Sequence, residues 1–196
     1  MLFKDVRLFP DLKNKKLFQM VVKMMVARGL LKEKDVDKYV ETLSKNYDKF
    51  TQSSTVDGLV TVVIISGKLA SIGKAGGLTS ALNNSSVPLK LVIVDSIQTN
   101  ARKSILQFQN TEVFTTVEML SDPYNHVLVP KHRLLTPDEK EKLLKFISVS
   151  QLPRLESSDI IARYLGLNAW DVVAIERVSP TTGLATYYRI VIPAAN

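Results

Sequence analysis

Two β-branched apolar runs in the middle of the chain constrain its fold more than any other feature. The first is Leu59-Val-Thr-Val-Val-Ile-Ile-Ser66 and the second is Leu89-Lys-Leu-Val-Ile-Val-Asp95. Continuous runs of this length, rich in Val and Ile, are typical of strands that are buried on both faces. Strands of this kind belong to a sheet covered by helices, so the two runs predict an open α/β sheet.

The segments around these runs complete the first module. A third strand is predicted over 113–116, and helices are predicted near 78–82 and 101–108 between the strands. Before the first strand, apolar residues recur at helical spacing over 12–29 and 35–47, which predicts two opening helices. A Gly-rich bend at 73–77, a loop at 83–88 and a turn at 122–125 separate or close these elements.

The last seventy residues have a different pattern. Thr136, followed by Pro137 and two acidic residues, predicts the start of a helix that continues over 140–146. A second helix is predicted over 158–165, ending at Gly166, and strands are predicted over 172–178 and 187–192 around a hairpin loop. We therefore predict an α+β chain of two domains, residues 1–125 and residues 126–196.

Composition excludes several classes of protein. The chain has no Cys, so it can hold no disulfide, thiolate zinc site or thiol nucleophile. No apolar run approaches the roughly 18 residues of a membrane span, and the start of the chain lacks a secretory signal. We expect a soluble, intracellular chain with no membrane partner.

The net charge of +7 is concentrated in the first fifty residues. The basic side chains there alternate with apolar positions, and seven of them form a stripe: Lys13, Lys15, Lys16, Lys23, Arg28, Lys32 and Lys34. Two interpretations stay open at this point. The stripe is either a solvated helix face or a surface that attracts phosphate through counterion release.

A phosphate-binding loop is the nearest approach to a catalytic motif. Gly67-Lys-Leu-Ala-Ser-Ile-Gly73-Lys74-Ala75 follows a predicted strand, as such a loop should. However, five residues separate the glycines instead of four, and Ala75 stands where a hydroxyl would hold magnesium. The spacing therefore argues against nucleotide binding.

A metal-dependent nuclease is the other enzyme class that we considered. Asp95 ends a strand, but Ser96-Ile97-Gln98 follows it without an acid-x-Lys pair, and Glu112 and Glu118 lack a Lys two residues on. A metal site needs several converging oxygen ligands. His126 and His132 are spaced by six residues, which fits no common ligand pair. We predict no catalytic residue, metal or cofactor.

From residue 126 onward, six blocks occur in order over about 66 residues. They are His126-Val-Leu-Val-Pro130-Lys131-His132, Gln151-Leu-Pro153-Arg154-Leu155, Asp159, Ala162-Arg-Tyr164-Leu-Gly166-Leu, Val172-Val173-Ala-Ile175, and Arg177-Val-Ser179-Pro-Thr181-Thr-Gly183 with Tyr187-Tyr188-Arg189-Ile190-Val191. In these blocks the chain resembles the fifth common subunit of eukaryotic nuclear RNA polymerases I, II and III, whose C-terminal part matches a small archaeal RNA polymerase subunit. Four positions depart from the family's usual residues: Ile160, Trp170, Pro180 and Leu184.

The resemblance implies an arrangement for both domains. Residues 1–125 would form the jaw domain, similar to an endonuclease fold without its active site, and residues 126–196 would form the polymerase-assembly domain. The segment 98–103 falls where the family carries a Thr-Pro-Ser-Ala loop near downstream DNA, although Thr99 replaces the Pro. The DNA-proximal candidates are Thr99, Asn100, Arg102 and Lys103.

The function that the resemblance implies is that of a non-catalytic polymerase subunit, present as one copy per complex in the nucleus. It would dock on the largest subunit, contact other polymerase subunits, and touch downstream DNA weakly and without sequence preference. The interface candidates are Pro130, His132, Pro153, Arg154, Asp159, Tyr164, Gly166, Arg177, Ser179, Gly183, Tyr188 and Arg189. Each Arg among them either faces a partner or forms an internal ion pair. The alternative function is a free-standing nucleic-acid-binding transcription regulator with the same fold.

Overall fold

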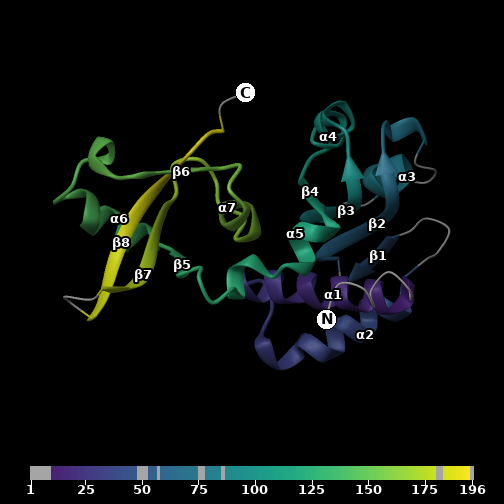
Figure 1. The fold of residues 1–196 in the computed structure, drawn as a ribbon, viewed down its shortest axis with the longest axis horizontal. Helices are drawn as coiled ribbons and strands as arrows, with labels where there is room; N and C mark the ends of the chain where they lie inside the picture. Colours follow the sequence, from purple (N-terminus) through teal and green to yellow (C-terminus); the bar gives the residue numbers. More distant parts are fainter. Residues whose placement is uncertain are drawn as a thin grey trace. The chain divides into compact units, whose positions relative to one another are not determined.

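A computed structural model describes residues 10–47, 53–56, 58–74, 78–84, 87–179 and 183–194. The chain divides into two compact units, Met1–Ser121 and Asp122–Asn196 (Figure 1). The first unit combines helices with one sheet, and the second is a small α+β unit with a β-hairpin. The predicted α+β fold class is confirmed, whereas the roles assigned to the two domains remain predictions.

The first unit contains eleven elements among its described residues, two of them short 3-10 turns. They are α1 (Pro10–Ala27), η2 (Glu33–Asp35), α2 (Val36–Lys45), β1 (Ser53–Val56), β2 (Val60–Leu69), η3 (Ile72–Lys74), α3 (Leu78–Asn84), β3 (Leu89–Ile97), α4 (Thr99–Ile105), β4 (Thr111–Thr115) and α5 (Thr116–Leu120).

The sheet of the first unit has the order β1-β2-β3-β4. The three strands predicted from the sequence are β2, β3 and β4, and they run parallel, while β1 pairs antiparallel with β2. Strand β1 was not predicted, because Ser-Ser-Thr-Val carries little apolar signal of its own. The parallel strands with helices between them give the open α/β sheet that the apolar runs predict.

Helices cover this sheet because β2 and β3 are apolar on both faces. On one face, α3 and α4 bury side chains such as Leu82 and Ile105 against Val63, Val92 and Val94. Side chains of the opposite parity on these strands are also buried. Helix α5 packs on β3 and on α1, and α1 packs on α2 (Figure 1). Helix α1 presents its buried side to these neighbours through Leu17, Phe18, Val21, Val22, Met24 and Met25.

The second unit contains eight elements among its described residues. They are η4 (Pro123–Asn125), β5 (Lys131–Leu134), α6 (Pro137–Leu144), η5 (Val149–Gln151), β6 (Arg154–Glu156), α7 (Ile160–Tyr164), β7 (Val172–Ser179) and β8 (Gly183–Ile192).

The sheet of the second unit has the order β5-β7-β8-β6. Strands β7 and β8 form an antiparallel hairpin, with β5 antiparallel to β7 and β6 parallel to β8. One face of the sheet packs against Leu143 and Leu144 of α6, and the other packs against Ala162 of α7. The short edge strands β5 and β6 were not predicted, because they depend on pairing partners far away in the sequence.

The hairpin continues beyond both of its neighbours in the sheet. Strand β5 pairs with β7 only as far as Glu176, and β6 pairs with β8 only from Ile190 onward. Beyond these points β7 and β8 continue to pair with each other up to Ser179 and Gly183 (Figure 1). We call residues 177–179 and 183–189 the hairpin arm.

Local sequence signals fix the ends of the two helices in the second unit. Thr136 is the N-cap of α6: its hydroxyl accepts from the Glu139 N–H, and the Glu139 carboxylate accepts from the Thr136 N–H. This capping box confirms the predicted helix start. Gly166 ends α7 with a φ of 65°, and the Leu167 N–H donates to the Ala162 carbonyl at 2.9 Å. Glycine adopts this left-handed conformation at low cost, which explains the predicted stop.

Three of the sequence predictions fall partly outside the described residues. They are the C-terminal part of the Gly-rich bend (75–77), the centre of the 83–88 loop (85–86) and the centre of the hairpin loop (180–182). None of the described helices is both long and apolar enough to cross a membrane.

Candidate functional site

A groove of about 380 Å³ lies on the α7 side of the second unit. Strands β5, β7 and β8, the start of α7 and the segment that leads into β6 contribute its walls. The lining residues are Pro130, His132, Pro153, Leu155, Asp159, Ile161, Ile175, Arg177, Tyr187, Tyr188 and Arg189. Five of the six sequence blocks that carry the family resemblance therefore meet in one place, although more than fifty residues separate the first lining residue from the last.

Strand register brings the polar residues of the groove together. His132 of β5 lies opposite Ile175 of β7, and Ile175 lies opposite Tyr187 of β8. Directly opposed residues share a face of the sheet, so these three side chains form one row across it. Asp159 approaches from α7, where its Oδ1 accepts from the Ile161 N–H at 2.8 Å and caps the helix.

The His132 ring is half-buried in this groove. Its Nδ1 lies 2.7 Å from the Pro130 carbonyl oxygen. Burial lowers the pKa of His132 below its usual 6.5, and the nearby Arg189 acts in the same direction. The Pro130 carbonyl and the Asp159 carboxylate act against this shift without cancelling it. The ring is therefore predominantly neutral at pH 7.

The arginines of this site form no ion pair within the described residues. The Arg177 guanidinium lies over the Tyr187 ring, with its Cζ 5.7 Å from the ring centroid. Arg154, Arg177 and Arg189 are all exposed. The sequence left open whether each Arg forms an internal ion pair or faces a partner. In the described part of the chain, none of these three side chains forms an internal ion pair.

The structure brings seven of the twelve interface candidates into the groove: Pro130, His132, Pro153, Asp159, Arg177, Tyr188 and Arg189. Arg154 lies outside it, exposed on β6. The Tyr164 side chain is buried in the unit and stacks on Tyr124, with ring centroids 5.4 Å apart. Gly166 ends α7, and Ser179 pairs with Gly183 at the end of the hairpin arm.

The apolar floor of the groove was not predicted from the sequence. Leu155, Ile161 and Ile175 are buried there, and Tyr187 is half-exposed at 49%. The family blocks contain Leu155, Ile175 and Tyr187 but do not indicate that these residues line a groove. No feature of the sequence indicated Ile161. No local pattern distinguishes an apolar residue that floors a groove from one in a core, because only the folded sheet decides which side remains open.

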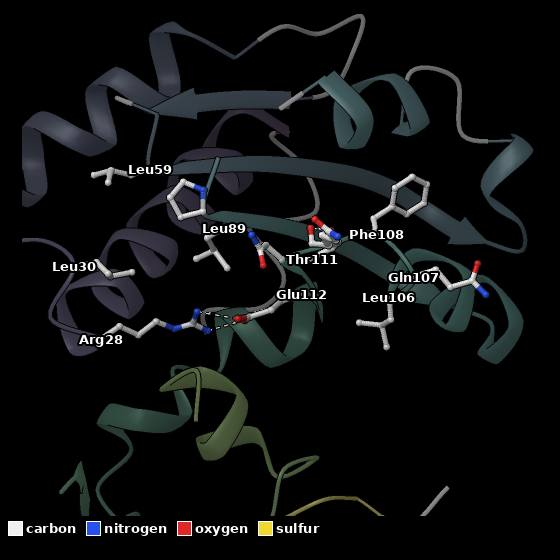
Figure 2. A pocket seen from close by; sticks show the side chains of 12 residues that line it. Arg28, Leu30, Leu59, Leu89, Leu106, Gln107, Phe108, Thr111 and Glu112 are labelled. Atoms are coloured by element: carbon white, nitrogen blue, oxygen red, sulfur yellow. Dashed lines mark hydrogen bonds and ion pairs between the residues drawn. The ribbon is translucent and has the colours of Figure 1, made fainter. Parts of the chain in front are cut away.

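A larger pocket, of about 640 Å³, lies in the first unit at the amino ends of its parallel strands. Figure 2 shows Arg28 and Glu112 pointing toward each other at one side of this pocket, where two hydrogen bonds of 2.9 and 2.6 Å join them. The aliphatic side chains of Leu30 and Leu106 line other parts of it and are about half-exposed. Its strongest charges are thus already paired within the chain.

The acidic residues considered for a nuclease site are also engaged. Asp95 accepts from the Lys13 ammonium at 2.5 Å, the Thr116 hydroxyl at 2.7 Å and the Gly67 N–H at 2.9 Å. Burial raises the pKa of Asp95, but these hydrogen bonds outweigh burial and hold it below its usual 3.8. Glu118 accepts from the Thr115 N–H in the capping box of α5. No group of three His, Asp or Glu residues in the described chain could hold a metal ion.

The DNA-proximal candidates all lie on α4. Thr99 and Asn100 are exposed in its first turn, Lys103 is exposed near its end, and Arg102 is half-buried. Within the N-terminal basic stripe, Lys13 and Arg28 are committed to ion pairs with Asp95 and Glu112. The stripe is thus not a uniform solvated face, because two of its seven cations hold α1 onto the sheet.

The fold is that of a two-unit α+β protein, and the sequence blocks that resemble a known family all lie in its second unit. The model of the family described as RNA polymerase Rpb5, C-terminal domain, matches residues 122–191. The chain is similar to the DNA-directed RNA polymerase subunit Rpo5 of Thermococcus kodakarensis, with 49% identity over 71 residues. That match covers 35% of this chain and 87% of the relative.

Two eukaryotic relatives match over a longer part of the chain. The DNA-directed RNA polymerases I, II, and III subunit rpabc1 of Dictyostelium discoideum is 38% identical over 107 residues, covering 51% of this chain and 54% of the relative. The DNA-directed RNA polymerases IV and V subunit 5B of Arabidopsis thaliana is 41% identical over 90 residues, covering 44% of this chain and 41% of the relative. The chain belongs to the Rpb5 family of DNA-directed RNA polymerase subunits.

Proposed function

We propose that this chain plays no catalytic role and docks on the largest subunit of its polymerase through the groove of the second unit. The observation that carries the proposal is the meeting of seven interface candidates in one groove, where Arg177 and Arg189 have no ion-pair partner among the described residues. Exposed guanidinium groups are well suited to carboxylates and carbonyls on a protein partner.

The exposed apolar side chains of the second unit support a partner as well. Val127, Leu128 and Phe146 are 93%, 83% and 88% exposed. Exposed apolar residues that are scattered singly need no explanation, but Val127 and Leu128 are neighbours in the sequence and together offer a partner an apolar contact.

The first unit would form part of the lower jaw beside downstream DNA. Lys103 and Asn100 on the exposed side of α4 would meet phosphates, which orient a protein on DNA without reading its sequence. The chain would act in the nucleus as one copy per complex. Support for the nucleus comes from the eukaryotic relatives, whose names refer to RNA polymerases I, II and III.

Reconstitution with the polymerase tests the docking. The tagged chain should retain the two largest subunits at about one-to-one stoichiometry through a wash at about 0.5 M salt, which removes loose electrostatic contacts. The R177E/R189E variant should lose them, as should each single reversal in part, while K142E, a single charge reversal on α6, should not. Recovery of the wild-type chain alone, or with nucleic acid only, would favour a free-standing regulator instead.

A salt titration tests the jaw. With the assembled polymerase on duplex DNA, K103A should lower the slope of log affinity against log salt by about 0.9, because one phosphate contact is lost. An unchanged slope would remove Lys103 from the DNA contact while leaving the docking proposal intact.

A further inference from the structure

Within the described part of the chain, the outer edge of β8 has no neighbouring strand over most of its length. Among the described residues, β6 pairs with β8 only at Ile190, Val191 and Ile192. Arg189 and the five residues before it, Leu184–Tyr188, pair with β7 on their inner side alone, and these five form the uncharged part of the edge. At about 3.3 Å per residue, this leaves an open edge of about 17 Å.

Backbone geometry directs hydrogen-bonding groups out of this edge. The Ile190 N–H donates to the Pro153 carbonyl at 2.9 Å and thus points away from β7, while the Val191 N–H donates to the Asp171 carbonyl on the β7 side. Because the two directions alternate along an antiparallel strand, Tyr188, Thr186 and Leu184 point outward like Ile190. Tyr187 and Ala185 point inward to β7.

Between Leu184 and Tyr188 this edge carries no charged side chain or Pro, and Arg189 is the only charged residue on the part of β8 that β6 leaves unpaired. Proteins protect open edges with charged side chains, Pro or very short strands. The outer strand β5 carries Lys131 and Arg133, β6 carries Arg154 and Glu156, β4 carries Glu112, and β1 has only four residues. Residues 184–188 of β8 are Leu-Ala-Thr-Tyr-Tyr, with neither a charge nor a Pro. This edge is therefore the one best suited to accept a strand.

The two faces of the hairpin arm differ in chemistry. On the α6 side, Leu184 and its cross-strand partner Val178 are 69% and 85% exposed. On the α7 side, Arg189 follows Tyr187 along β8, and Arg177 leans over the Tyr187 ring toward the edge. A strand beside β8 would place alternate side chains against Leu184 on one face and near the two cations on the other.

We propose that an extended segment of the largest polymerase subunit, with alternating apolar and acidic side chains, adds to this sheet as a strand along Leu184–Tyr188. This inference rests on the proposed docking and specifies how it occurs. The main chain of the segment would supply affinity through the outward groups of Leu184, Thr186 and Tyr188. Its carboxylates would face Arg189 and the Arg177 guanidinium that lies over Tyr187, and its apolar side chains would pack on Leu184.

Amide hydrogen exchange of the free chain and of the chain in reconstituted polymerase tests the strand addition. The Thr186 and Tyr188 amides should exchange rapidly in the free chain and become at least tenfold slower in the complex. The Ala185 and Tyr187 amides, already bonded to β7, should be slow in both. If the wild-type chain assembles without this alternating gain in protection, the inference fails while the docking proposal stands; failure to assemble at all overturns both.

A pair of substitutions at one position isolates the outward N–H. T186P removes that donor, and T186V keeps it together with a β-branched shape, so the two variants separate the backbone bond from side-chain packing. We expect T186P to weaken retention of the largest subunit at least tenfold and T186V to leave it near the wild-type value. Equal retention by both variants would overturn the inference.

Two controls keep this comparison sound. Slow exchange at Ala185 and Tyr187 in free T186P verifies that the hairpin still forms. If the hairpin of T186P does not form, L184K replaces this variant in the assay. L184K places a charge at the same edge and must show the same loss of retention. Sedimentation of the free chain tests the competing occupant, because a dimer that L184K dissociates would assign the edge to a second copy and overturn the proposal.

Discussion

Charged side chains on the sheet of the first unit and beside the groove of the second unit are used in opposite ways. In the first unit, Asp95 and Glu112 are each bound by a cation from the opening helical region, and both ion pairs are partly buried. In the second unit, Arg177 and Arg189 stand exposed beside a groove and have no carboxylate partner in the described chain. The difference separates charges that hold a fold together from charges that remain available to another molecule.

Arg28→Met should have the largest effect on stability. The Arg28 side chain is only 8% exposed, and its removal leaves the partly buried Glu112 carboxylate without this cation partner. We expect the first unit to lose about 2 kcal/mol, measured by urea unfolding followed by far-UV circular dichroism. The double variant R28M/E112Q should recover part of the loss, because no unpaired charge remains; a loss below about 0.5 kcal/mol for R28M would contradict the assignment.

Asp95→Asn should come next, with a loss of about 1.5 kcal/mol at pH 7. Because the folded-state pKa of Asp95 lies below its usual 3.8, its contribution is present above about pH 4 and disappears as the pH falls through the folded-state value. The acid limb of the stability curve of the first unit should therefore be shallower in D95N. Identical acid limbs in the two proteins would show that the carboxylate does not hold the cluster.

The same kind of change in the second unit should cost much less stability. Arg177→Ala and Arg189→Ala should each stay within about 0.5 kcal/mol of wild type, since neither side chain forms an ion pair with a residue that the structure describes. Trp170 is the only Trp in the chain, so its fluorescence during urea unfolding reports on the second unit. A loss comparable with that of R28M would reveal a structural role for these arginines and erase the contrast between the units.

The smallest expected effect concerns His132. Its folded-state pKa lies below 6.5, so protons favour the unfolded state: stability falls as the pH drops from 6.5 through the folded-state value, and is constant below it. The H132Q variant should lack this dependence in the Trp170 signal. If the wild-type second unit is instead more stable at pH 5.5 than at pH 7.5, Asp159 outweighs burial at this ring.

Local patterns predicted the regular elements well and the short edge strands poorly. The runs that became β2 and β3 are mostly apolar and rich in Val and Ile, and their type follows from composition and length. Strands β1, β5 and β6 have only three or four residues each, and they exist because a longer strand lies beside them. Information of that kind is non-local, so no window of the sequence contains it.

The candidate site could likewise be predicted only in part from the sequence. Spacing and residue type excluded a phosphate loop and a nuclease, and family blocks located Arg177, Arg189 and His132. The blocks did not reveal that the carboxylates considered for a nuclease are engaged, because Asp95 meets Lys13 across 82 residues. They also did not separate Tyr164, which is buried, from the residues that line the groove.

The two ion pairs of the opening helical region also affect how the chain is made. They tie the two ends of the first long helix to residues 82 and 84 positions further along. At about 5–20 residues per second, the ribosome needs on the order of 4 to 17 seconds to deliver those partners. During this time the apolar face of α1, which contains Met and Phe side chains, is covered only in part, by α2. Any delay in translation between residues 45 and 112 lengthens the time during which that face can be captured by a chaperone or by a neighbouring nascent chain.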